Sequence, residues 1–262
     1  MNERYLSGKE LYGDNFNQKQ IKEWFKDEKE GYSKLNEDYS NYGYHSINIL
    51  HGFNKLKKIK KFENVLCFGG ARAEEILPII KKINKITIIE PSKKLRVKGL
   101  EVKKINYIFP AFSGKLKLMN NSFNLITCFG ALHHIPNVSF VFSELVRVLD
   151  KGGFLLMREP IVSLGDWTKP RKGLTKRERG ISENIFEKLI KKNNLKIISK
   201  RKIMFPLLRR LNYKNKKAGN NKLFVYLDYL ISKLFYWNDK YHSTREIHKF
   251  RPQSVFYVLR KL

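Results

Sequence analysis

Two adjacent histidines are the residues of this chain best suited to proton chemistry. His133 and His134 stand in the loop GALHHIP, which follows an apolar run at 123–128. An imidazole has an ordinary pKa of about 6.5, so it can act as a general base toward a hydroxyl group at neutral pH. The alternative is that one or both histidines hold the loop by hydrogen bonds or pack against a ligand. Neighbours in an extended loop point apart and no third ligand stands out, so we expect no metal site.

A second set of chemically capable side chains closes the next apolar run. Arg158 and Glu159 follow the segment 153–157, so they reach the same edge as the histidine loop if the runs are parallel strands. Glu159 is a candidate second base or a clamp for an acceptor molecule. Arg158 is a candidate partner for an anionic acceptor. An ion pair between the two side chains is the structural alternative.

Glycines and one acid mark a third candidate site, nearer the start of the chain. Gly69 and Gly70 directly follow the apolar run 64–68, and glycine lets the backbone approach a ligand closely. Glu90 ends the next apolar run, about 20 residues further on, where a carboxylate can accept the two hydroxyls of a ribose. The alternatives are an ordinary strand-to-helix turn and a solvent-exposed acid.

The elements that must position these residues alternate between strand and helix. This alternation predicts an α/β fold: a Rossmann-like, doubly wound, mostly parallel seven-stranded sheet with helices on both faces. Strands are expected at 64–68, 85–90, 106–109, 123–128, 153–157, 195–203 and 254–260. Helices are expected at 72–83, 138–149, 182–192 and 222–235, with Ser182 as a cap.

The chain also divides into segments of different character. Two amphipathic helices, at 18–29 and 44–56, predict an N-terminal helical cap over one edge or mouth of the sheet, within residues 1–60. A core domain is expected over 61–203. A basic and helical insertion or lid, irregular between 204 and 221, is expected over 204–250, and the last strand of the core sheet over 251–262.

The order of these elements resembles the class I S-adenosylmethionine-dependent methyltransferases, of the methyltransferase type 11 kind. That family places an acid and three alternate glycines after the first strand, where this chain has Cys67, Gly69, Ala71 and Ala73. The resemblance implies S-adenosyl-L-methionine as cofactor. It implies a cofactor site made of Phe68, Gly69, Gly70, Ala71, Glu90, Pro91, Ser92, Ser113, Phe129 and Gly130. Because Cys67 replaces the acid that usually meets the methionine ammonium, Glu74 or Glu75 is a hypothetical substitute.

The resemblance further implies methyl transfer to oxygen, and less readily to nitrogen. Methylation of base amines typically uses an Asn- or Asp-Pro-Pro-aromatic loop, and methylation of pyrimidine carbon uses a cysteine beside proline; residues 127–130 offer neither. The expected acceptor is therefore a small-molecule, sugar or lipid-linked hydroxyl, and nucleic acid is disfavoured. Two alternatives stay open: an RNA methyltransferase that uses the basic surface, and a non-catalytic methyltransferase-like domain that has lost cofactor binding.

Charge adds an expectation about the acceptor. The chain carries 53 basic and 24 acidic residues, a net charge of +29, which favours an anionic partner unless it reflects composition alone. Asp166 and Trp167, in a long loop, form a candidate sugar-facing pair, with a buried packing Trp as the alternative. The loops together resemble methyltransferases of surface-glycan pathways. The helix at 222–235 is either a lid, a membrane-surface element in peripheral contact, or core.

The remaining features bound the class of protein. No apolar run approaches the about 20 residues that a membrane-spanning helix needs, and the first ten residues lack the apolar core of a signal peptide. Cys67 and Cys128 both fall in expected buried strands, where small core residues are the ordinary interpretation. We expect a cytoplasmic protein, and the sequence leaves its oligomeric state open.

Overall fold

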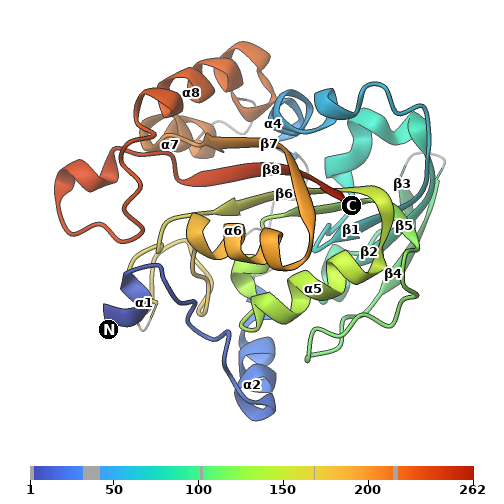
Figure 1. Ribbon diagram of the computed structural model, residues 1–262, viewed down its shortest axis with the longest axis horizontal. Helices are drawn as coiled ribbons and strands as arrows, with labels where there is room; N and C mark the ends of the chain where they lie inside the picture. Colours follow the sequence, from blue (N-terminus) through green and yellow to red (C-terminus); the bar gives the residue numbers. More distant parts are fainter. Residues whose placement is uncertain (1–2, 32–41, 101–102, 168, 215–217) are drawn as a thin grey trace.

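The apolar runs of the sequence form one eight-stranded sheet in the computed structural model, which describes residues 3–31, 42–100, 103–167, 169–214 and 218–262 (Figure 1). The strands lie in the order β3-β4-β2-β1-β5-β6-β8-β7. Their bounds are β1 Phe62–Phe68, β2 Ile83–Ile89, β3 Gly99–Leu100, β4 Lys103–Ile108, β5 Phe123–Phe129, β6 Leu149–Pro160, β7 Leu195–Ile203 and β8 Ser254–Lys261.

Five neighbouring strands run parallel, and this arrangement places the site. β4, β2, β1, β5 and β6 are parallel, while β8 lies antiparallel between β6 and β7. Cys67 of β1 pairs with Ile88 on one side and with Thr127 on the other. The chain therefore runs outward from β1 through β2 to β4 and then crosses back to form β5 on the other side of β1. Such a reversal opens a crevice at the carboxyl ends of the strands. The predicted doubly wound fold is confirmed, with the two-residue β3 as an additional eighth strand.

Helices cover both faces of the sheet. α5 (Val138–Val148) and α6 (Glu183–Lys192) pack on one face, while α4 (His45–His51) and α8 (Lys222–Leu234) lie on the other (Figure 1). The face of α5 toward the sheet is apolar at helical spacing, and its central residues Val141, Phe142 and Leu145 are completely buried. Each face thus has its own hydrophobic core, with the sheet between them.

Two predicted helices differ from expectation, each at an identifiable residue. The segment expected as a helix at 72–83 is a 3₁₀ helix over Glu74–Lys82, and Pro78 inside it removes a backbone donor. The helix expected at 44–56 is divided into α4 and a 3₁₀ turn at Phe53–Leu56. Gly52 lies at the junction, where a Cβ would approach the Phe256 ring to 2.7 Å.

The predicted irregular stretch after β7 also required correction. Residues 206–214 form a helix, α7, which begins at a proline. Ser182 precedes α6 as expected, but its hydroxyl donates to the carbonyl of Gly8 and makes no side-chain cap. Short 3₁₀ turns also occur at Lys93–Leu95, Leu132–His134, Ala218–Asn220 and Glu246–Lys249.

The N-terminal helices reach the carboxyl edge of the sheet from different sides. α1 spans Glu3–Leu6, and α2 spans Gln18–Glu28 behind a capping box at Asn17. The Trp24 indole of α2 donates to the carbonyl of His134 at 2.7 Å, whereas α4 packs on the opposite side of the sheet (Figure 1). Residues 1–2, 32–41 and 215–217, which belong to the predicted cap and insertion, lie outside the described residues, and the proposed domain boundaries stay predictions.

Candidate active site

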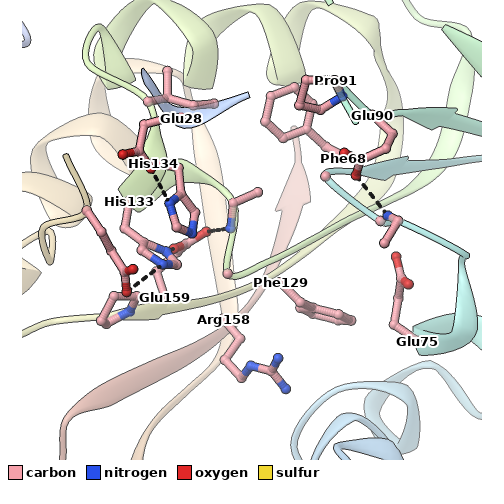
Figure 2. A pocket seen from close by; sticks show the side chains of 18 of the residues that line it. Glu28, Phe68, Glu75, Glu90, Pro91, Phe129, His133, His134, Arg158 and Glu159 are labelled. Carbon is pink, nitrogen blue, oxygen red and sulfur yellow. Dashed lines mark hydrogen bonds and ion pairs between the residues drawn. The ribbon is translucent and has the colours of Figure 1, made fainter. Parts of the chain in front are cut away.

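A cavity of about 740 Å³ lies where the carboxyl ends of β1, β2, β5 and β6 meet (Figure 2). The predicted cofactor residues line it, namely Phe68, Gly69, Gly70, Ala71, Glu90, Pro91, Ser92, Phe129 and Gly130. Ser113 does not. Its carbonyl accepts a hydrogen bond from Asn137, and its neighbours Ala111, Phe112 and Gly114 contribute to the wall instead. The predicted cofactor site is therefore assembled in space apart from that one residue.

The glycine turn keeps an open backbone although two of its positions hold alanine. A Cβ on Gly69 would lie 2.6 Å from the Cβ of Ala131, and a Cβ on Gly70 would lie 2.6 Å from Oε1 of Glu75. Ala71 and Ala73 have φ angles of 46° and 59°, in the left-handed region that glycine adopts freely. An L-residue there costs roughly 1–2 kcal/mol. The chain thus holds the conformation of a three-glycine loop at the expense of local strain.

Glu90 lies where a ribose-binding acid must be. Its Oε2 accepts from the Ala71 amide at 3.1 Å, and its Oε1 accepts from the Ser92 amide at 2.9 Å (Figure 2). These bonds fix the carboxylate at the cavity wall, and each oxygen keeps a further lone pair for a ligand hydroxyl. Burial raises the pKa of Glu90 despite the two amides.

Glu75 occupies the neighbourhood of the missing family acid. Its carboxylate is buried and lies beside Cys67, and Thr127 Oγ1 donates to its Oε1 at 3.3 Å. Burial raises the pKa of Glu75 to about 7, because a thiol and a hydroxyl compensate little of the lost hydration. Glu74, the other hypothetical substitute, also lines the cavity and is half-buried. Of the two, Glu75 is the side chain adjacent to Cys67.

His133 is held between two carboxylates. Its Nδ1 lies 2.7 Å from Glu159 Oε2, and its Nε2 lies 3.5 Å from Glu178 Oε1. Burial opposes the charged imidazole, but both carboxylates outweigh burial and raise the pKa of His133 to about 9. The side chain is therefore an imidazolium at neutral pH and has no free lone pair. This corrects its assignment as a base.

Glu159 binds the loop that carries the histidines through hydrogen bonds. Besides His133, it accepts from the amides of Ala131 and Leu132, both at 2.9 Å. Burial acts against ionisation, yet His133 and these amides hold the pKa of Glu159 below its ordinary value. The carboxylate is a positioning group for the loop, so its assignment as a second base or acceptor clamp is not supported by the geometry.

His134 has the arrangement of a base oriented by a carboxylate. Its Nδ1 lies 2.9 Å from Glu28 Oε2, which also accepts from Thr175 Oγ1 at 2.6 Å (Figure 2). The other oxygen of Glu28 accepts from the Arg177 amide at 2.6 Å. Burial works against the charged carboxylate, but His134 and the two donors hold the pKa of Glu28 below its ordinary value. A proton on Nδ1 leaves Nε2 of His134 as a proton acceptor.

The two imidazoles lie together rather than apart. Their ring centroids are 4.1 Å from one another, because the loop turns as a short 3₁₀ helix at Leu132–His134 instead of extending. Donor atoms of His133, His134 and Glu178 fall within 4.8 Å of one another, a grouping that a metal ion can use. Both nitrogens of His133 already face carboxylates, so the protonated imidazole of His133 balances part of the charge of this cluster.

Arg158 lies at the cavity, whereas the predicted sugar-facing pair, Asp166 and Trp167, lies outside it. Arg158 lines the cavity, donates to Asn48 Oδ1 at 3.3 Å, and lies over the Tyr44 ring at 4.1 Å; it does not pair with Glu159. Trp167 is buried against Tyr12, with ring centroids 5.9 Å apart, and Asp166 lies 3.9 Å from Lys169. Neither Asp166 nor Trp167 lines the cavity, so the structure does not bring them to this site, and their contact with the acceptor stays a prediction.

Sequence reasoning missed two of the acids that contact the histidines, Glu28 and Glu178. Glu28 is separated from His134 by 106 positions and comes from α2, which the sequence predicted only as part of a cap. Glu178 comes from the basic loop that was considered for its charge and length. The only available signal was an acid in a segment otherwise rich in Lys and Arg.

Comparison with known proteins defines the class. Residues 65–157 match the family model of a methyltransferase domain, a span that contains the glycine turn, Glu90 and both histidines. A solved S-adenosylmethionine-dependent methyltransferase from Mesorhizobium loti is 16% identical, with 79% of this chain and 94% of that chain covered and a TM-score of 0.52. A S-adenosylmethionine-dependent methyltransferase from Methanosarcina mazei is 14% identical, with coverages of 81% and 98% and a TM-score of 0.51. No curated protein sequence matches the chain.

The structural neighbours establish the fold, and the family match adds the activity. Residues 65–157 form a methyltransferase domain, and the chain has the fold of the class I methyltransferases. Within the described residues, no helix combines the length and apolar character needed to cross a bilayer.

Proposed function

We propose that this enzyme methylates a hydroxyl oxygen of an amphiphilic acceptor, a sugar or lipid-linked molecule with an anionic group. The observation that carries the proposal is the Glu28–His134 pair at the wall of the cofactor cavity. A hydroxyl is a poor nucleophile until its proton is removed, and a carboxylate-oriented imidazole serves this purpose in many enzymes.

The cofactor half of the cavity suits a nucleoside with a charged amino-acid tail. Gly69 and Gly70 line the cavity at positions where a Cβ would clash with Ala131 and Glu75, so the backbone itself forms the wall there, and Glu90 offers acceptors to two ribose hydroxyls. Glu75 offers a buried carboxylate to the ammonium group. When bound, S-adenosylmethionine supplies a methyl group activated by the sulfonium.

In the proposed step, the acceptor oxygen forms a bond to the methyl carbon while the carbon–sulfur bond breaks. The hydroxyl proton passes to Nε2 of His134, and Glu28 stabilises the resulting imidazolium. Holding the acceptor in line with the methyl group can supply roughly 7–11 kcal/mol of the barrier reduction. Glu159 and the cationic His133 contribute rigidity, because they fix the loop on which His134 stands.

One wall of the cavity combines apolar side chains with the guanidinium of Arg158, and we assign this wall to the acceptor. Met204, Leu208, Phe224 and Val225 line the side formed by α7 and α8. Arg158 lies near the end of β6 on the same cavity, where it can pair with an anionic group. A lipid-linked or otherwise amphiphilic acceptor matches both features.

The test measures transfer of labelled methyl from S-adenosylmethionine to lipid, soluble glycan and RNA fractions of the source cells. We expect label in a nuclease-resistant lipid or glycan fraction. Label that nuclease releases would favour the RNA methyltransferase instead.

Variants then test the base. His134→Gln and Glu28→Gln should each lower turnover by roughly 10²–10⁴-fold while affinity for S-adenosylhomocysteine is kept. His242→Gln is a matched control, because His242 hydrogen-bonds Ser163 and does not line the cavity. Full turnover by His134→Gln on a hydroxyl acceptor would remove that residue from the base role.

A further inference from the structure

An apolar stripe runs along the outer face of α8. Leu223, Leu227, Leu230 and Leu234 recur at helical spacing, and Trp237 continues the stripe beyond the helix. All five are exposed, with Leu223 at 66%, Leu234 at 73% and Trp237 at 66%. α7 adds two more exposed leucines, Leu207 and Leu211. A monomeric soluble protein rarely exposes so continuous an apolar surface without a partner.

The opposite face of α8 packs against the rest of the protein, so the exposed leucine stripe is not the face that forms the hydrophobic core. Val225 and Ser232 are buried toward α4 and β7. Asp228, also buried, accepts from the amides of Met204 and Phe205 at 2.8 Å each, which ties the helix to the end of β7. The helix is thus anchored on its inner side, and the outer side remains for something else (Figure 1).

Positive charge surrounds the stripe. Between Met204 and Phe250 the sequence has ten Lys or Arg and three Asp or Glu, and one of those acids is the buried Asp228. Exposed bases lie on α7, on α8 and in the segment that follows, namely Arg210, Lys222, Lys233, Lys240, Arg245 and Lys249. An occupant of this face must therefore be both apolar and anionic.

We propose that α7, α8 and the segment to Phe250 form a docking face for an anionic membrane surface. Leucines and an exposed tryptophan among lysines are the composition of helices that lie in the bilayer interface. A second copy of this chain would bring the same positive charge, so self-association through this face is opposed by repulsion. RNA satisfies the charge but leaves the leucine stripe uncovered.

The docking face is also a wall of the active-site cavity. Leu208 of α7 and Phe224 and Val225 of α8 line the cavity from the inside, while their neighbours along each helix face outward. Seating the outer face on lipid would therefore bring the acceptor half of the cavity close to the membrane. This inference deepens the proposed function, because a lipid-linked acceptor would reach the cavity from that surface.

Vesicle binding by the full-length protein tests the proposal without cofactor or acceptor. Vesicles of phosphatidylcholine alone are compared with vesicles that also contain phosphatidylglycerol. We expect binding to the anionic vesicles that weakens with salt, and a blue shift in tryptophan emission that is absent from Trp237→Phe. Trp24 and Trp167 are buried, so Trp237 is the responsive fluorophore.

Two kinds of variant separate the apolar and charged contributions. Leu227→Glu with Leu230→Glu should weaken binding by at least roughly tenfold, and each of Lys222→Glu and Lys233→Glu by about fivefold or more. Met119→Glu, at an exposed position in the loop between β4 and β5, is the matched control and should bind as wild type. Thermal unfolding confirms that each variant is folded.

Three outcomes would overturn the proposal. The first is equal binding to both kinds of vesicle, and the second is unchanged binding by the double glutamate variant. The third is a wild-type protein that does not bind vesicles but forms a concentration-dependent oligomer, which the double glutamate variant does not form. Because no methyl transfer is measured, loss of vesicle binding leaves the test of His134 intact, and an inactive His134→Gln variant should still bind vesicles.

Discussion

Buried carboxylates line both halves of the cavity, but their environments shift ionisation in opposite directions. In the cofactor half, burial raises the pKa values of Glu75 and Glu90. In the acceptor half, burial also acts to raise the pKa values of Glu28, Glu159 and Glu178, but neighbouring groups hold them below their ordinary range. The pKa of Glu178 is about 2. The difference lies in the partners rather than in the depth of burial.

The partners explain what each half is prepared to do. Among the described residues, the carboxylates of Glu75 and Glu90 accept hydrogen bonds only from neutral groups, while Arg158 and Arg96 act on them without a direct ion pair. Their negative charge therefore suits a ligand that brings hydroxyls or an ammonium. The acceptor half contains its own cation in the His133 imidazolium, so the carboxylates around it are compensated before any ligand arrives. The cofactor half is therefore completed by binding, while the acceptor half is preorganised by folding.

The largest expected effect comes from removing one charge of the preorganised half. Glu159→Gln leaves the buried His133 with one carboxylate fewer, and we expect unfolding free energy to fall by about 3–5 kcal/mol. Glu90→Gln is the control in the other half and should cost less than about 1 kcal/mol, because ionised Glu90 has no cation in hydrogen-bond contact. Urea denaturation measures both. Equal losses of unfolding free energy in the two variants would contradict the proposed difference between a preorganised acceptor half and a cofactor half completed by binding.

A smaller effect is expected from titrating His133. Its folded pKa of about 9 lies above the ordinary value, so the stabilisation is fully present below about pH 6.5 and is lost as pH rises through about 9. We expect about 2–3 kcal/mol of stability to disappear across that window. Unfolding measured between pH 6 and 9.5 checks this, with His133→Gln as the reference. If His133→Gln keeps the wild-type pH dependence of stability, groups other than His133 are responsible for that dependence.

Glu75 gives the complementary prediction for the cofactor half. An ammonium favours the ionised carboxylate, so affinity for S-adenosylhomocysteine should rise as pH passes through about 7. Glu75→Gln should lower that affinity roughly tenfold to a hundredfold and abolish the pH dependence. Without ligand at pH 8, the same variant should be more stable by about 1–3 kcal/mol, since a buried charge is removed. Calorimetry that finds unchanged affinity would exclude Glu75 as the ammonium partner.

The smallest effect concerns the strained alanine of the glycine turn. Ala71→Gly relieves a left-handed residue and should stabilise the protein by up to about 1 kcal/mol. Ala218→Gly, in a 3₁₀ turn without positive φ, should instead cost about 0.5–1 kcal/mol. Paired thermal melts compare the two. A loss at both positions would mean that the turn is not strained.

Much of the cofactor half followed from local sequence. Gly69 and Glu90 each stand directly after an apolar run, and parallel strands bring such positions to one edge. Ser113 was misassigned because the loop after β4 is irregular, and position within such a loop does not determine which residue faces a cavity.

The acceptor half and the outer surface could be predicted only in part. The loop with His133 and His134 was located, but two acids that contact these imidazoles, Glu28 and Glu178, come from other segments of the chain. Trp167 was a candidate sugar-facing residue, with the more frequent buried packing position as the alternative, and the structure places it buried against Tyr12.

The sequence by itself determined the alternation of strands and helices, and with it the edge of the sheet at which glycine turn, ribose acid and histidines meet. That information is local, because side-chain periodicity and turn residues fix each element. Only the tertiary structure decided which carboxylates meet each imidazole and which face of α8 is covered. Charge on a buried group depends on all neighbours in space, and an amphipathic pattern shows that two faces differ without showing what lies against each.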